Sequence, residues 1–441
     1  MKYFSNQKGT ISMMVIVGVL LTIVVLVILG AYIFIRERGD VVDEPIAIED
    51  GNTTGQEEVK IEDGETQEFT YGFLNLENQR APGKNVIYSP LSIKYLLHLL
   101  SDGANGNTKK EIDRLIKNES LTQYKNIDKV LSLANALYIK DECKDKVLDS
   151  YIDNAKEKYD AEIKYDSFKD ASNINNWVSE KTFNIINDFL EDGQVQDPNL
   201  VMILVNAIAV DMKWKTEFDM LSTHLGQFNN QAGEGIETAY MHKSEDTSDE
   251  IAYKIDDDVT VLSMDLEENE GIGLEFDAIM PNEIALEDFI AGMDKVKVED
   301  YLSNLTKASE TNKGVNITIP RFDFDYSIAF KDELKELGIN DAFDMNADFS
   351  NITGDTSLFV GDAIHKADIE FSEKGVKAAA ASAAIMLEKA IEIDEELPIS
   401  VVIDKPFMFV IRDKATGEVW FTGAVYEPVL WSNVEAEYDR H

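Results

Sequence analysis

The pattern of apolar and polar residues divides the chain into segments of different kinds. Residues 11–35 carry no charge and are rich in Val, Ile and Leu, which is long enough for one helix across the hydrocarbon core of a bilayer. Residues 36–66 are acidic and free of aromatic side chains, so they lack the apolar surface that a folded core requires. From residue 67 to 428, apolar residues recur with helical or strand periods. The pattern predicts a short cytoplasmic segment (1–10), a transmembrane signal anchor (11–35), an acidic flexible linker (36–66), one globular domain (67–428) and a polar tail (429–441).

Three helices are predicted early in the globular domain. Ser89 and Pro90 suit a helix start, because a Ser hydroxyl can cap the first turn and proline fits its first position. Thr108 and Glu111 have the spacing of a capping box. An amphipathic helix is also predicted over 174–186. The early helical periods cover Phe69–Asn78, Leu91–Leu100 and Lys109–Lys117.

Strands are predicted on both sides of the middle of the domain. Leu200–Val210 is almost continuously apolar, which is typical of a strand buried on both faces. Asn206 is a polar residue within that strand, so it requires hydrogen-bond partners. Near the C-terminus, Phe407–Ile411 and Val419–Val425 flank a turn and predict a hairpin. Helices and strands in this order predict an α+β domain.

Composition excludes several classes of function. Asp and Glu outnumber Lys and Arg by 83 to 41, giving a net charge of -42, which disfavours nucleic acid and anionic membrane surfaces as partners. Cys143 is the only cysteine, so no intrachain disulfide is possible. The five histidines show no HxxxH or HxH spacing, so we predict no metal site, and no cofactor is indicated. The sequence contains no G-x-S-x-G motif, which argues against a hydrolase.

The stretch Glu373–Met386, with the sequence E-K-G-V-K-A-A-A-A-S-A-A-I-M, departs from these patterns. Its alanines favour helix by propensity. Both flanks look like strands, however, and Gly375 lies near its start, where it weakens a helix. A run of small side chains can lie exposed as a loop or enter a sheet between two strands at little steric cost.

Together with His365–Ala367 and Pro406–Phe407, this stretch resembles the hinge and reactive-centre loop of the serpins. Further segments of the chain resemble serpin signatures in the same order: Asn85–Ile93, Gly103–Glu111, Leu200–Val210, Lys213–Phe218 and Ala347–Ser350. The resemblance implies a serpin fold of three β-sheets with about nine helices and an exposed reactive loop. In this chain it would be preceded by one transmembrane helix, as in a membrane-anchored prokaryotic-type member.

The resemblance implies that the protein is not an enzyme but a suicide-substrate inhibitor of serine proteases. A protease would cleave the loop, and the freed loop would insert into the main sheet before the acyl-enzyme is hydrolysed. Residues that would turn inward on insertion are small and uncharged, which favours inhibition over a non-inhibitory surface binding protein. The hinge implied by the family comprises Glu373, Gly375, Val376, Ala378, Ala379, Ala380 and Ala381.

The family's spacing from Glu373 implies that the attacked bond lies between Lys389 and Ala390. A lysine there favours trypsin-like targets, whose specificity pocket is acidic. The segment 390–405 is longer than usual and acidic, so the bond could be shifted. Cleavage after Met386, Leu387 or Glu388 would favour elastase-like, subtilisin-like or cysteine proteases.

Two further groups of residues match positions that control the opening of the serpin sheet. Glu373 and Arg321 match an ion pair at the top of the sheet beside Trp214, where we expect a surface pair of little thermodynamic weight. The second group matches a polar cluster that satisfies buried hydrogen bonds in either state of the sheet: Ser89, Ser92, Asn206 and His365.

The predicted partners follow from this interpretation. We expect a monomer that forms a covalent complex with a target serine protease and contacts the lipid bilayer through residues 11–35. The domain would lie outside the cell, or be secreted if the anchor is cleaved.

Overall fold

The computed structural model describes residues 69–430, apart from 118–120, 198–199, 357 and 377–396. The chain divides into two units, 1–62 and 63–441, and the described residues all belong to the second. The predicted membrane anchor, the acidic linker and most of the polar tail therefore lie outside the described residues. Within the described ranges, no helix combines the length and the apolar character needed to cross a membrane.

Ten α-helices lie in the described part of the chain, close to the nine expected. Ser89 caps α3 as predicted, because its side chain accepts a hydrogen bond from the Ser92 amide at 3.1 Å. The helices are α2 (Phe69–Arg80), α3 (Pro90–Gly103), α4 (Gly106–Ile116), α5 (Asp149–Tyr159), α6 (Ser172–Lys181), α7 (Asp192–Val195), α8 (Leu286–Ala291), α9 (Lys295–Tyr301), α10 (Lys331–Glu336) and α11 (Ser350–Thr353).

The predicted capping box of α4 is wrong. Asn105 caps that helix instead, its side chain accepting from the Gly106 amide. The Thr108 hydroxyl accepts from the Asp348 amide at 2.9 Å, and Glu111 accepts from backbone amides of residues 340 and 341. Both side chains therefore bind the backbone of a distant loop instead of capping their own helix.

The strands form three sheets, as expected. The first runs in the order β1 (Val86–Tyr88), β18 (Val419–Val425), β17 (Phe407–Asp413), β10 (Leu274–Pro281), β9 (Val259–Asp265), β8 (Ile251–Ile255) and β11 (Thr306–Lys307). β17 and β18 form the hairpin predicted from the sequence. The second, here called the small sheet, comprises β16 (Ile399–Val402), β12 (Val315–Pro320), β7 (Gly235–Asp246) and β6 (His224–Asn229).

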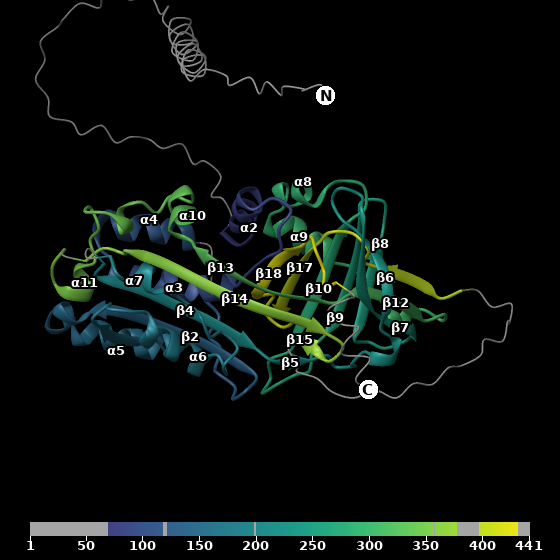
Figure 1. The fold of residues 1–441 in the computed structure, drawn as a ribbon, viewed down its shortest axis with the longest axis horizontal. Helices are drawn as coiled ribbons and strands as arrows, with labels where there is room; N and C mark the ends of the chain where they lie inside the picture. The colour runs from purple at the N-terminus through teal and green to yellow at the C-terminus, as the bar shows by residue number, and fades with distance from the viewer. Residues whose placement is uncertain (1–68, 118–120, 198–199, 357, 377–396, 431–441) are drawn as a thin grey trace, which may run out of the picture. The chain divides into compact units, whose positions relative to one another are not determined.

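The third, here called the main sheet, has the order β3 (Glu162–Asp166), β2 (Leu131–Lys140), β4 (Met202–Val210), β14 (Asp362–Ser372), β15 (Gly375–Val376) and β5 (Met212–Lys213), while β13 (Phe322–Ala329) also pairs with β14. β4 and β14 lie side by side in its centre (Figure 1). All nine residues of β4 are buried. Its side chains alternate between the large core and a smaller cluster around Trp177 of α6, so the strand is covered on both faces as predicted.

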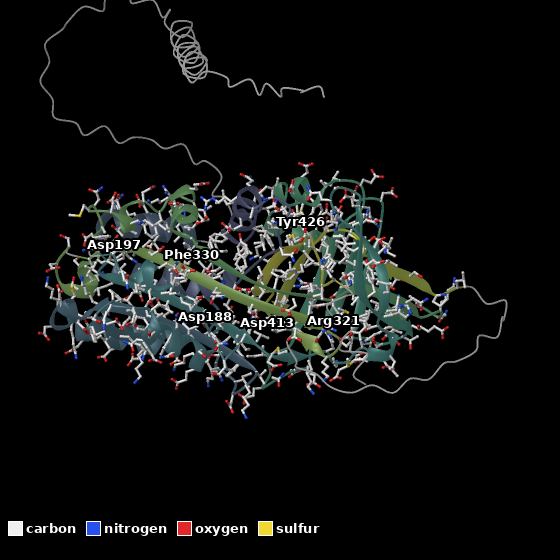
Figure 2. All side chains as sticks on the ribbon, viewed as in Figure 1. Asp188, Asp197, Arg321, Phe330, Asp413 and Tyr426 are labelled. Atoms are coloured by element: carbon white, nitrogen blue, oxygen red, sulfur yellow. The ribbon has the colours of Figure 1, made fainter. Side chains whose placement is uncertain are left out.

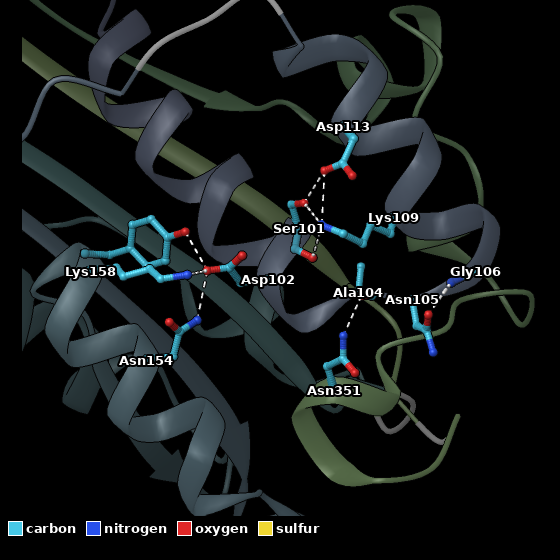
Figure 3. A network of polar contacts seen from close by, with 11 residues as sticks. Ser101, Asp102, Ala104, Asn105, Gly106, Lys109, Asp113, Asn154, Lys158 and Asn351 are labelled. Atoms are coloured by element: carbon cyan, nitrogen blue, oxygen red, sulfur yellow. Dashed lines mark hydrogen bonds and ion pairs between the residues drawn. The ribbon is translucent and has the colours of Figure 1, made fainter.

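Polar contacts join the helices α3 and α5 (Figure 3). Asp102 of α3 accepts hydrogen bonds from three side chains of α5: Asn154 at 2.8 Å, Lys158 at 2.9 Å and Tyr159 at 2.7 Å. These three donors outweigh the effect of burial and lower the pKa of Asp102. Because α5 connects β2 to β3, these contacts anchor those two strands to α3.

Candidate functional site

In the centre of the main sheet, β4 and β14 are hydrogen-bonded to each other along only part of their length. β4 and β14 run parallel and pair from Asp362 opposite Ile203 to Lys366 opposite Ala207. Beyond Lys366 both strands continue, but no further pairing between them is present among the described residues. A cavity of about 10 Å³ lies where they part, lined in part by Val210, Asp368, Ile369 and Val376.

The chain turns back at the end of β14 and enters this gap. Phe371 pairs with Val376 and Ser372 with Gly375, so β15 runs antiparallel to β14. On its other side, β15 pairs with Met212 and Lys213 of β5. The first two residues after the turn therefore already lie between the two halves of the sheet, in the direction that a further inserted strand would take.

Gly375 fits this position because it has no side chain. A Cβ there would lie 2.2 Å from the Met212 carbonyl oxygen and 2.6 Å from the Lys213 Cα. Contacts this short are not possible for real atoms, so any other residue would push β15 away from β5.

Backbone contacts to the segment after β5 hold the turn in place. Trp214 donates from its indole Nε1 to the Ser372 carbonyl at 2.8 Å and from its backbone amide to the Lys374 carbonyl at 2.9 Å. The Trp214 ring also packs edge-on against Phe371, with ring centroids 5.1 Å apart. The Phe218 amide donates to the Glu373 carbonyl at 2.8 Å.

The Glu373 carboxylate has a closer partner than the one expected. Its Oε1 accepts from the Thr223 hydroxyl at 2.6 Å, whereas Arg321 Nε lies 3.8 Å from its Oε2. Arg321 lies close to the end of β14 and β15 (Figure 2). The Glu373 side chain is only 4% exposed and that of Arg321 13%. The pair is therefore buried rather than on the surface, and removing one partner would leave a buried charge.

The four residues of the predicted polar cluster lie together where β4 and β14 still pair. His365 is directly opposite Asn206 in the ladder, with His365 Nδ1 3.2 Å from Asn206 Oδ1. The Ser89 amide donates to His365 Nε2 at 3.0 Å. The Ser92 hydroxyl donates to Asn206 Oδ1, and Asn206 Nδ2 donates to the Ser92 carbonyl at 3.1 Å.

These contacts fix the tautomer of His365. Its Nε2 accepts from an amide, so Nδ1 carries the proton and donates to the Asn206 oxygen. Complete burial lowers the pKa of His365 to about 3. The ring is therefore neutral at physiological pH, and its role is to pair buried groups rather than to transfer protons.

Asn135 of β2 is a fifth member that the sequence did not single out. It lies opposite Asn206 in the β2–β4 ladder, and its Oδ1 accepts from Asn206 Nδ2 at 2.7 Å. Its own Nδ2 is 3.4 Å from the Tyr159 carbonyl at the end of α5. The cluster thus crosses three neighbouring strands and reaches α5, the helix that Asp102 anchors.

Comparisons with known proteins agree with this architecture. Residues 65–428 match the family model described as serpin (serine protease inhibitor). The chain belongs to the serpin family. A serine protease inhibitor of Cyanea capillata is 31% identical to it over 365 residues, covering 78% of this chain and 93% of the relative. Members of this family are mostly protease inhibitors and broadly not enzymes, although some serpins are non-inhibitory.

Solved serpin structures share the fold. The thermophilic serpin tengpin in its native state has a TM-score of 0.68 at 25% identity, over 82% of this chain and 93% of that one. A complex of thyroxine-binding globulin with thyroxine has a TM-score of 0.70 at 26% identity, over 82% and 98%.

Part of the predicted site lies outside the described residues of this serpin. That part comprises the later hinge residues Ala378, Ala379, Ala380 and Ala381 and the candidate cleavage positions Met386, Leu387, Glu388, Lys389 and Ala390. The described site is therefore the start of the hinge, the gap that it enters and the polar cluster beneath.

Proposed function

We propose that this serpin is a suicide-substrate inhibitor of serine endopeptidases. The observation that carries the proposal is the arrangement of β4, β14 and β15. A strand that continued β15 would run antiparallel to both parallel neighbours and could pair with each. It would replace a ladder of five residue pairs with two longer ladders, so insertion has a large driving force once the loop is cut.

The proposed reaction starts as ordinary proteolysis. The protease serine attacks the Lys389 carbonyl carbon and passes its proton through the protease histidine to the Ala390 nitrogen. The peptide bond breaks, Ala390 leaves as a free amine, and Lys389 becomes an ester on the protease. The freed segment after Val376 then continues β15 into the gap. This movement carries the attached protease along the sheet before water can hydrolyse the ester.

The residues after β15 suit this movement. Val376 is buried, and a strand period of two puts Ala378, Ala380, Ser382 and Ala384 on the same face. All four side chains are small and uncharged. Lys377, the only charged residue of this stretch, would point to the opposite face.

Lys389 makes trypsin-like proteases the proposed targets, because their specificity pocket is acidic. A shift of the bond to Met386, Leu387 or Glu388 would redirect the inhibitor towards elastase-like, subtilisin-like or cysteine proteases. The mass of the fragment released on cleavage distinguishes these cases.

The test is to incubate the full-length chain with trypsin and with an elastase, then examine denaturing gels and fragment masses. We expect a denaturant-resistant adduct with trypsin and a fragment that begins at Ala390. Ala380→Arg places a charge on the inward face and should abolish the adduct while leaving cleavage intact. Ala379→Arg, one residue away on the outward face, is the matched control and should still form the adduct.

Clean cleavage without an adduct, by every protease tested, would contradict the inhibitory function. That result would favour the second candidate, a non-inhibitory surface binding protein. The structural similarity to thyroxine-binding globulin in complex with thyroxine is the observation in favour of that alternative.

We further propose that residues 11–35 anchor the chain, with the domain outside the cell. The uncharged run supports this proposal, and the acidic linker would hold the domain away from an anionic surface. The expected result is that the full-length chain stays with membranes after washing at high pH, whereas a chain starting at residue 67 does not. Equal release of both chains would contradict the anchor.

A further inference from the structure

Two histidines that are 18 positions apart in sequence lie together on the small sheet. His224 begins β6, and His242 lies on β7 two positions beyond Tyr240, the residue that pairs with His224. This diagonal places both side chains on the same face of the sheet. Their ring centroids are 5.8 Å apart with an angle of 71° between the planes. His224 is exposed and His242 is half-buried, so the pair is open to solvent.

Both rings contact an oxygen through Nδ1, and the Nε2 of His242 also contacts the hydroxyl of an exposed serine. His224 Nδ1 lies 3.1 Å from the Ser222 carbonyl, which can only accept, so Nδ1 carries the proton and Nε2 keeps its lone pair. His242 Nδ1 lies 3.1 Å from the Thr318 hydroxyl, and its Nε2 lies 2.9 Å from the exposed Ser244 hydroxyl. A histidine that binds a metal commonly donates its other N–H to an oxygen in this way.

We propose that His224 and His242 together bind a transition-metal ion such as Zn²⁺ through their Nε2 atoms. Two imidazoles on one tetrahedral ion place their ring centres roughly 5 Å apart, close to the observed separation. The Ser244 hydroxyl can turn towards water, which frees His242 Nε2 for the metal. The described residues contain no group of three or more His, Cys, Asp or Glu side chains arranged to hold a metal, so the proposed site has two protein ligands among them. Imidazole donors favour Zn²⁺ over Ca²⁺.

The position of the pair gives the metal a role at the hinge. Thr223 directly precedes His224, and its hydroxyl donates to Glu373 at 2.6 Å. An ion that joins His224 of β6 to His242 of β7 would fix the start of β6 and hold Thr223 against Glu373. This regulatory part rests on the proposed inhibitory function, in which the hinge must move. Bound metal would then favour the resting position of β15.

Calorimetric titration of the full-length chain with Zn²⁺ alone tests the site. We expect His224→Ala and His242→Gln each to raise the dissociation constant at least about tenfold. His441→Gln, which removes a histidine outside the described residues, is the matched control and should bind like the original chain. A second titration with Ca²⁺, which prefers oxygen ligands, measures how much metal binds to the carboxylates instead of the histidines. Unchanged affinity in both variants, or no binding by the original chain, would overturn the site.

Hydrogen exchange tests the link to the hinge. Zn²⁺ should slow amide exchange at residues 371–376 in the original chain and have no effect there in His224→Ala. Equal exchange with and without Zn²⁺ in a chain that binds the metal would overturn the link. Because His224 is exposed, its alanine variant should fold normally, and an unchanged unfolding midpoint checks this. Neither measurement needs a trapped protease, so a failure of inhibition would leave both results interpretable.

Discussion

At the scale of single residues, the acidic character of the chain extends into its interior. Arg412 of β17 lies between two carboxylates of β10, with 2.8 Å from its Nη2 to Glu275 and 2.9 Å from its Nε to Asp277. One guanidinium cannot fully compensate two buried carboxylates. Burial, followed by the charge of Asp277, raises the pKa of Glu275 to about 7.

This raised pKa predicts how stability depends on pH. The folded chain keeps a proton on Glu275 that the unfolded chain releases near pH 4.5. The contribution of Glu275 to the free energy of unfolding is therefore fully present below pH 4.5 and is lost as pH rises through about 7. Glu275→Gln should remove this dependence and stabilise the fold at pH 8 by about 1–3 kcal/mol, as measured by urea unfolding at pH 5 and pH 8. Glu299→Gln, which changes an exposed glutamate of α9, is the control. Parallel pH profiles for Glu275→Gln and the original chain would contradict the assignment.

At the scale of elements, the close packing of β15 against β5 predicts that one added methyl group at Gly375 displaces the strand. Gly375→Ala would place its Cβ against the Met212 carbonyl, so we expect β15 to leave its position between β14 and β5. Amide exchange at Val376 and Lys213 should then become much faster. Gly193→Ala in α7, where an added Cβ meets nothing within 4 Å, should leave exchange unchanged. Protected amides at Val376 in Gly375→Ala would show that β5 moves instead.

The sequence predicts features that depend on neighbouring residues, but not those that depend on contacts between distant segments. Local chemistry predicted the Ser89 cap, and the apolar run predicted a β4 buried on both faces, because both depend on neighbouring residues. The capping box at Thr108 failed because a loop 240 residues away takes that hydroxyl. The contacts of Asn135 and the proximity of His224 and His242 depend on strand register, which the pattern of one strand does not contain. The signal available for Asn135 was a polar residue in the middle of a largely apolar strand.

At the scale of the whole molecule, the net charge acts over longer distances than the contacts that hold the hinge. The net charge of -42 makes separate copies of the chain repel each other at low ionic strength and attracts basic partners, with a range set by the Debye length. The contacts that hold the hinge are short, buried and little screened. Salt should therefore change encounters between molecules more than it changes the resting position of β15.

The partial ladder between β4 and β14 also constrains the order of folding. His365 and Asn206 pair across 159 residues of chain, so this contact closes a long loop, which slows its formation. The competing hairpin of β14 with the segment after it needs only a short turn and should close far sooner. Trp214 and Phe218 hydrogen-bond to that turn in the resting fold, so we expect these contacts to form before the hairpin extends. Under the proposed function, the active inhibitor is the state in which that turn is held in its resting position, and its lifetime is set by a barrier rather than by the depth of its energy minimum.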